Sequence, residues 1–338
     1  MGWLGLDDTD SLAGGCTTKT MEELILNLPK NVQVGTVRLV RLWPFASGRT
    51  RGNAALAVEL QCEDEEFLIA HLNSWWMNEL SSLKGLISPS HHSDRPQVPS
   101  DPGMVWFDSQ PDELHYWSAV QHHVAIDDVP PAIKSWGGAG VIGATAAVAW
   151  PGRTSTWEAI AWRHTSDGSK PRSVCLESLE EIDSWPGTFM SRDPRSGTSL
   201  IAPRGHSPVL CGVRAKTELE ASKALAHVLS SQHTERSAGF RTFMTNQATG
   251  DHLQPATRAM VEEIEVHPQR KHARIQTSDG IWVSFGEGGP VNQLSRWLKN
   301  GDIVEMKGLK SDDGTFHLEQ LRVVSWNARN KQRPLCSV

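Results

Sequence analysis

The sequence predicts an α+β fold in which two mixed α/β units are followed by a small β-barrel. Over the first hundred residues, strand and helix signals follow the order β-α-β-β-α-β, which is typical of a ferredoxin-like arrangement. A similar order recurs between residues 157 and 244. From residue 262 onward, the helical signals give way to short apolar runs separated by turn dipeptides, as in a small barrel.

The first unit is predicted from the periodicity of its apolar residues. Apolar spacing of three and four residues indicates a helix, whereas alternation indicates a strand. We therefore expect strands at residues 3–6, 34–42, 54–60 and 104–107, and helices at 17–28 and 65–80. The stretch 88–101 is rich in Ser, His, Pro and Asp and is expected to be a loop.

The second unit starts after a Pro-Gly break at residues 151–152. We expect its strands at 157–162, 188–190, 208–213 and 240–244, and its helices at 176–185 and 217–229. Before it, residues 137–147 are rich in Gly and Ala. Such a segment allows backbone to approach a phosphate at a helix start, and it equally suits close helix packing through small residues. The sequence alone leaves both interpretations open.

The third unit is expected to be a barrel, with strands at residues 273–276, 281–284, 303–308 and 318–324. About five short strands in roughly 65 residues suit an OB-type barrel, a fold that often binds single-stranded nucleic acid. An SH3-like or other small barrel is the alternative.

Three carboxylates, those of Asp7, Asp8 and Asp10, follow the first predicted strand within four positions. Like charges this close repel one another, so folding gains nothing from crowding them. A divalent cation removes the conflict, and Mg²⁺ suits carboxylates combined with triphosphate oxygens. The sequence therefore predicts a metal site at these residues. The alternative is an Asp-rich turn that caps the following helix.

A cluster of glycines and hydroxyls comes next, formed by Gly14, Gly15, Thr17 and Thr18. Glycines, hydroxyls and a helix N-terminus together can hold a phosphate. The segment lacks the Gly-Lys-[Ser/Thr] ending of a Walker A loop. The alternative is that Thr17 or Thr18 is simply the N-cap of the helix.

Two further polar segments are candidates for substrate binding. Arg51, Gly52 and Asn53 combine a fork-shaped guanidinium with an amide, which suits recognition of a phosphate or a base. An exposed arginine-rich hairpin is the alternative. Asn246 and Gln247 lie in an amide-rich loop after a predicted strand, where they either hydrogen-bond a base or a polyamine or merely connect two domains.

Composition limits the remaining possibilities. The net charge of −6 argues mildly against nucleic acid, although residues 30–53 contain basic residues and no acidic one. No apolar run is long enough for a membrane helix, and the start of the chain is not a signal peptide, so we expect a cytoplasmic protein with no membrane partner. Five cysteines without CxxC spacing provide neither a disulfide framework nor a complete zinc site.

Eight segments, taken in order, carry a resemblance to one family. They are GLDDTDS at 5–11, GGCTT at 14–18, RLVRLWP at 38–44, TRGNAA at 50–55, GAGVIGATAA at 138–147, WEAIAWR at 157–163, SPVLCGVR at 207–214 and TNQATGDHL at 245–253. Together they resemble the archaeal agmatinylcytidine synthetases, which modify isoleucine tRNA. That family usually ends in a zinc ribbon, and here the sequence stops in a basic tail, residues 327–338, where a ribbon would begin.

The resemblance implies a kinase-like catalytic domain at residues 1–128, a ferredoxin-like domain at 129–255 and an OB-type, tRNA-binding barrel at 262–326. It implies an ATP-dependent ligase with ATP and Mg²⁺ as cofactors and no zinc. The substrates would be agmatine and the wobble cytidine in the CAU anticodon of isoleucine tRNA. ATP would activate C2 of the base by phosphorylation, and agmatine would then attack C2. No protein partner is inferred.

The resemblance also distributes roles among the candidate residues. Asp7, Asp8 and Asp10 would hold Mg²⁺, and either Thr17 or Thr18 would be the autophosphorylated threonine. ATP or phosphate would be bound by Gly14, Gly15, Arg51, Gly52 and Asn53. The pocket for agmatine would be formed by Pro208, Gly212, Arg214, Asn246 and Gln247.

Two other functions stay open on sequence alone. A small-molecule kinase or ligase would use the same Asp-rich Mg-ATP site without RNA, and the negative net charge favours it slightly. A non-catalytic RNA-binding protein would keep the barrel, but binding alone needs no triad of carboxylates.

Overall fold

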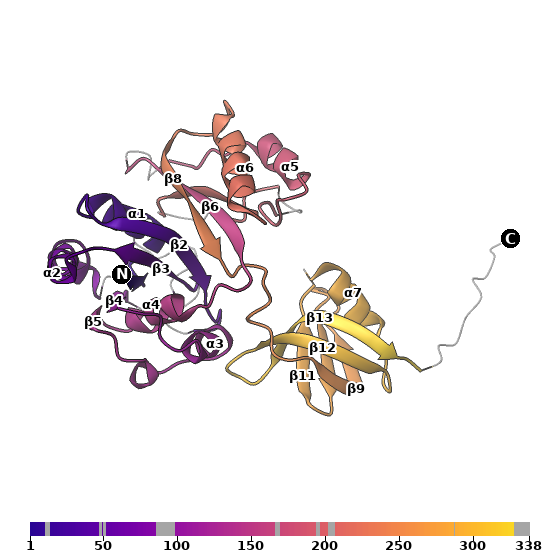
Figure 1. The fold of residues 1–338 in the computed structure, drawn as a ribbon. Coiled ribbons are helices and arrows are strands. Elements are labelled where there is room, and N and C mark those ends of the chain that lie inside the picture. The colour runs from indigo at the N-terminus through magenta and orange to yellow at the C-terminus, as the bar shows by residue number, and fades with distance from the viewer. Residues whose placement is uncertain are drawn as a thin grey trace. The chain divides into compact units, whose positions relative to one another are not determined.

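The computed structural model describes residues 1–10, 14–46, 49, 52–85, 99–165, 170–193, 197–201, 207–286 and 288–327. The chain divides into two compact units, Met1–Asp251 and His252–Val338. The first is built on a large mixed sheet with helices, and the second is a closed β-barrel, so the predicted α+β fold is confirmed (Figure 1). No helix in the described part of the chain is long and apolar enough to cross a membrane.

The sheet of the first unit has the strand order β5-β4-β1-β3-β2-β8-β6-β7. Its strands are β1 (Gly2–Asp7), β2 (Gln33–Arg41), β3 (Ala54–Gln61), β4 (Gly103–Phe107), β5 (Lys134–Gly137), β6 (Thr156–Arg163), β7 (Val209–Ala215) and β8 (Ser237–Thr245). The two halves of the sheet join where β2 and β8 pair in parallel, Arg38 with Met244 and Leu39 with Thr245. This join brings residues from distant parts of the sequence to one continuous surface.

The first half of the sheet has the predicted β-α-β-β-α-β order. Strands β4, β1, β3 and β2 pair antiparallel in that order, as in a ferredoxin-like sheet. Helices α1 (Thr17–Asn27) and α2 (Glu65–Trp75), the latter continued by a π-helical turn at Trp76–Leu80, pack on one face around Leu4 and Leu6. Helices α3 (Leu114–Gln121) and α4 (Gly140–Ala149) cover the other face.

The second half repeats this order incompletely. Strands β8, β6 and β7 carry helices α5 (Leu176–Asp183) and α6 (Glu218–Ser230) on one face. The strand predicted at 188–190 is wrong, because only an isolated bridge joins Thr188 to Ala215. Met190 has a φ of 47°, a left-handed conformation that cannot continue a strand.

Small residues let helix α4 lie unusually close to the sheet. A Cβ atom added to Gly5 in β1 would lie 2.4 Å from the Ala144 carbonyl oxygen, and one added to Gly140 in the glycine-rich segment would lie 2.3 Å from the Gly103 nitrogen. Both distances are too short for any residue but glycine. The glycine-rich segment therefore does serve close helix packing, one of the two interpretations of its sequence, and the contact presses α4 against the end of β1.

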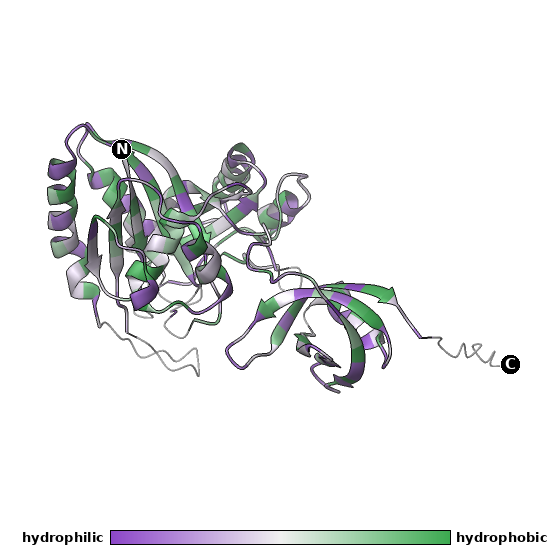
Figure 2. Ribbon diagram, turned by 60° about the horizontal axis from the view of Figure 1, so that its bottom comes forward, coloured by the Kyte–Doolittle hydropathy of each residue, from purple (hydrophilic) through white to green (hydrophobic). Residues whose placement is uncertain are grey.

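The second unit is a closed barrel of β9 (Thr257–Val266), β10 (Ala273–Thr277), β11 (Gly280–Ser284), β12 (Ile303–Lys310) and β13 (Phe316–Ser325). The order β10-β11-β13-β12-β9, with β11 and β13 parallel, is that of an OB fold. Hydrophobic and hydrophilic residues alternate along its strands (Figure 2), and Trp282 lies fully buried inside. Strand β9 begins five residues before residue 262, and helix α7 (Gly289–Trp297) was not predicted.

Candidate active site

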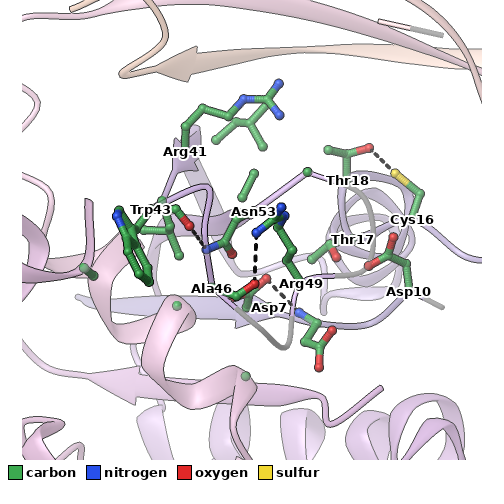
Figure 3. A pocket seen from close by; sticks show the side chains of 18 of the residues that line it. Asp7, Asp10, Cys16, Thr17, Thr18, Arg41, Trp43, Ala46, Arg49 and Asn53 are labelled. Carbon is green, nitrogen blue, oxygen red and sulfur yellow. Dashed lines mark hydrogen bonds between the residues drawn. The ribbon is translucent and has the colours of Figure 1, made fainter. Parts of the chain in front are cut away.

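A cavity of about 490 Å³ lies in the first unit, with Asp7, Thr17 and Arg41 at its wall (Figure 3). Both halves of the sheet contribute lining residues. The cavity is bordered by the end of β1, the start of α1, the end of β2, the start of α4, and the strands β6 and β7. The lining residues with side chains suited to chemistry are Asp7, Asp8, Asp10, Cys16, Thr17, Thr18, Arg41, Arg49, Asn53, His122, His123, Glu158, Ser207 and Arg214.

Asp7 and Asp8 are held where β1 ends. The Asp8 backbone has a φ of 55°, and its N–H donates to Asp7 Oδ1 at 2.7 Å. The Asp101 N–H donates to Asp8 Oδ2, also at 2.7 Å. Helix α4 closes over this turn, since a Cβ atom on Gly143 would lie 1.9 Å from Asp7 Oδ2. Backbone groups thus fix both carboxylates at the cavity wall.

Burial makes both carboxylates reluctant to ionise. It raises the pKa of Asp7 well above its ordinary value, and the nearby charges of Asp8 and Asp10 raise it further. Burial also raises the pKa of Asp8 to about 7, opposed by the Asp101 hydrogen bond and reinforced by repulsion from Asp10 and Asp101. Among the described residues, no group of three or more His, Cys, Asp or Glu side chains is arranged to hold a metal ion. The acids therefore do not form a complete metal site by themselves.

The two threonines at the start of α1 differ in their surroundings. Thr18 Oγ1 accepts a hydrogen bond from Trp162 Nε1 at 3.1 Å and lies 3.0 Å from Cys16 Sγ. Thr17 lines the same cavity, and in the described part of the chain its hydroxyl makes no hydrogen bond that would compete with a ligand. Gly14 and Gly15 do not line the cavity; Gly15, with a φ of 78°, shapes the turn before α1.

The segment after β2 contributes a second wall. Asn53 lines the cavity and its Nδ2 donates to the Trp43 carbonyl at 2.7 Å, while Gly52 leaves room beside the Arg41 guanidinium. Arg49 Nη1 donates to the Ala46 carbonyl at 3.2 Å. Arg51, which was expected to bind phosphate, lies outside the described residues.

Of the five residues expected to form the agmatine pocket, Arg214 lines the cavity and the other four do not. Asn246 instead bonds the backbone of Arg41, and the Gln247 carbonyl accepts from Thr156 Oγ1 at 2.6 Å. The Pro208 carbonyl accepts from the Arg163 N–H at 2.7 Å, and Gly212 packs under the Ile201 side chain.

The most informative residue that the sequence did not single out is Glu158. It is fully buried in β6, and its Oε1 accepts from Arg41 Nη2 at 2.6 Å. Arg214 Nε lies 3.5 Å from the other carboxylate oxygen. A lone acid inside the apolar strand TWEAIAWR was the available signal, because such a residue needs a buried partner.

Comparison with known proteins assigns the chain to a family. The TiaS TCKD domain matches residues 3–141 and the TiaS FLD domain matches residues 138–252. The isoleucine-tRNA 2-agmatinylcytidine synthetase TiaS of Thermococcus sibiricus is 30% identical over an alignment of 367 positions, gaps included. The alignment covers 98% of this chain and 82% of that protein. The chain belongs to the TiaS family.

The chain is also similar to another TiaS protein and to a solved TiaS structure. That of Pyrococcus horikoshii is 31% identical over 264 residues, so the matched part spans 74% of this chain and 59% of that relative. A crystal structure of TiaS in complex with isoleucine tRNA and ATP matches with a TM-score of 0.80 and 26% identity, covering 96% of this chain and 82% of that chain. The two TiaS domain matches meet at residues 138–141, where α4 begins beside the cavity.

The raised pKa of Asp8 predicts how stability depends on pH without divalent cations. An unfolded Asp has a pKa near 4, whereas that of folded Asp8 is about 7. Its protonation favours the folded state below pH 4, and this contribution is lost as the pH rises through 7. We expect wild type, in urea unfolding with EDTA, to lose stability between pH 5 and pH 8 relative to Asp8→Asn.

The matched control is Asp108→Asn, which neutralises an exposed carboxylate in the same unit. It should follow the pH dependence of wild type. If the free energy of unfolding changed with pH in the same way for wild type and Asp8→Asn, the assignment of a raised pKa to Asp8 would be contradicted.

Proposed function

We propose that this chain is an ATP-dependent ligase that converts the wobble cytidine in the CAU anticodon of isoleucine tRNA to 2-agmatinylcytidine. The observation that carries the proposal is the joining of acidic, hydroxyl and guanidinium groups from both TiaS domains in one cavity. Relatives named for this reaction, and a related structure that holds isoleucine tRNA and ATP, support it.

The proposed chemistry explains why ATP is needed. The C2 oxygen of cytosine is a poor leaving group, and transfer of a phosphoryl group from ATP to that oxygen makes it a good one. The primary amine of agmatine then attacks C2, forming the new C–N bond as the C2–O bond breaks and phosphate departs with the oxygen. The base must leave the anticodon stack to reach the cavity, which costs a few kcal/mol.

Asp7, Asp8 and Asp10 are the residues that would hold Mg²⁺. Their donor set fits, because Mg²⁺ usually takes one or two carboxylates and completes its shell with phosphate oxygens and water. A protein cluster of three fixed ligands is therefore not required. The bound cation would neutralise phosphate charge, while the chain itself contributes the fixed orientation of the Asp7 and Asp8 carboxylates.

Other contacts are proposed from their position at the same cavity. Gly52 and Asn53 lie where a phosphate or the cytosine would be positioned, with Arg51 and the turn at Gly14 and Gly15 adjacent in sequence to lining residues. Two residues expected in the agmatine pocket belong to a wall with an excess of positive charge, since Arg214 lines the cavity there and Asn246 bonds the backbone of Arg41. Because agmatine is itself cationic, these residues are proposed to face a phosphate and not the amine. The barrel, as an OB fold, and the tail after residue 327 would hold the tRNA, mainly through its phosphates.

The direct test is mass spectrometry of nucleosides from unmodified isoleucine tRNA with a CAU anticodon, incubated with the protein, ATP, Mg²⁺ and agmatine. We expect a cytidine that has gained the mass of agmatine less water, and none with the Asp8→Asn variant. ATP consumption that is independent of tRNA, without modified cytidine, would point instead to a small-molecule kinase or ligase. Binding of tRNA without either signal would point to a non-catalytic RNA-binding protein.

Thr17 is the proposed site of self-phosphorylation, because the Thr18 hydroxyl is already engaged by Trp162. Incubation with ATP in the absence of tRNA should add phosphate to wild type and to Thr18→Ala. Thr17→Ala should remain unmodified by intact-mass analysis. A phosphate retained in Thr17→Ala but lost in Thr18→Ala would reverse the assignment.

A further inference from the structure

Glu158 is costly for folding, because a fully buried carboxylate loses its hydration. Burial alone would raise the pKa of Glu158, but the positive charges of Arg41 and Arg214 outweigh that effect and hold the pKa below its ordinary value. The side chain is therefore ionised. Because well-packed apolar residues are often at least as stabilising as a buried ion pair, the arrangement calls for a role beyond stability.

The backbone of Arg41 is fixed from the opposite side. Its N–H donates to Asn246 Oδ1 at 2.7 Å, and Asn246 Nδ2 donates to the Arg41 carbonyl at 2.9 Å. Asn246 Nδ2 also donates to the Tyr116 hydroxyl at 3.0 Å, which in turn donates to Asp251 Oδ2 at 2.6 Å. Glu158 at the guanidinium and Asn246 at the backbone thus leave Arg41 little freedom to move.

The pair of arginines is still accessible from the cavity. Arg41 Nη2 and Arg214 Nε face Glu158, but the Arg41 side chain is still 31% exposed and both arginines line the cavity. Two guanidiniums and one carboxylate leave a net charge of about +1 at this wall. Partly exposed guanidiniums with an excess of positive charge are what an anionic ligand would neutralise.

The geometry points to Arg41 and Arg214 as a clamp for a phosphate group of ATP, with Glu158 as the positioning residue that holds both guanidiniums. The inference rests on the proposed function. ATP is favoured over an RNA phosphate because Asp7, Asp8 and Thr17, the groups proposed to meet the triphosphate, line the same cavity. The aspartates would then hold a cation on one wall and the two arginines would form the clamp on another, with the triphosphate of one ATP between them.

Glu158→Gln in the full chain tests the role of Glu158. The amide keeps the shape but loses the charge that aligns the two arginines. We expect the Kd for a non-hydrolysable ATP analogue and the KM for ATP to rise about tenfold or more, and the Kd for isoleucine tRNA to stay within about twofold. Arg41→Lys is the second variant, for use where Glu158→Gln folds poorly. It keeps the charge but removes the forked guanidinium, and we expect the same selective loss of ATP affinity.

The matched control is Glu235→Gln, which changes another Glu paired with a buried arginine. Glu235 contacts Arg163 Nε at 2.5 Å and does not line the cavity. It should leave both affinities unchanged. An unchanged ATP affinity in Glu158→Gln and Arg41→Lys would overturn the clamp, and a selective loss of tRNA affinity would overturn its assignment to ATP. Failure of wild type itself to bind the analogue would instead count against the proposed function.

Discussion

The crowding of the Asp7 and Asp8 carboxylates at the buried end of β1 is the constraint around which this cavity is organised. Strand β1 lies between β4 and β3, so its end is enclosed by the sheet and covered by α4. The glycines that let α4 approach also bring Gly143 against Asp7. Two acids that repel each other and have lost water gain most from a cation, which itself attracts phosphate. The fold therefore holds the Asp7 and Asp8 carboxylates close together, and binding of a cation with its phosphate ligand would reduce their repulsion.

The joined sheet supplies the opposite charge. Pairing of β2 with β8 places β6 and β7 on the far side of β8 in the same sheet. From there, Glu158 contacts Arg41 at the end of β2, and Arg214 contacts Glu158. Alternation along β6 turns Glu158, Ile160 and Trp162 toward the cavity side and leaves Ala159 and Ala161 under α5 and α6. The first half supplies Asp7, Asp8 and Arg41, and the second half supplies Glu158 and Arg214, so the ion-paired arginines meet only where the halves join. This gives a physical reason for the two TiaS domains to share one sheet.

The sequence was informative where periodicity or local crowding carries the signal. The first six elements and the barrel strands β10 to β13 were predicted, whereas β9 was not. Asp7, Asp8, Thr17 and Asn53 lie together at the cavity, as adjacent motifs suggested. The lone acid Glu158 in the apolar strand β6 was a local signal, but its partner Arg41 lies 117 positions away and could not be predicted from it. Asn246 and Arg41 are 205 positions apart, so the sequence could not show that the Asn246 side chain hydrogen-bonds the Arg41 backbone. Helix α7 was missed because Asn292 and Ser295 are its buried residues, which blurs the apolar pattern.

Proton release on nucleotide binding tests the central claim most directly, namely that a cation and phosphate relieve the conflict between Asp7 and Asp8. Isothermal titration calorimetry of Mg·ATP into the full chain at pH 7, in buffers of different ionisation enthalpy, measures the number of protons released. Because burial raises both pKa values, binding should release on the order of one proton, and less from Asp8→Asn. Binding of Mg·ATP with no proton released would contradict the account.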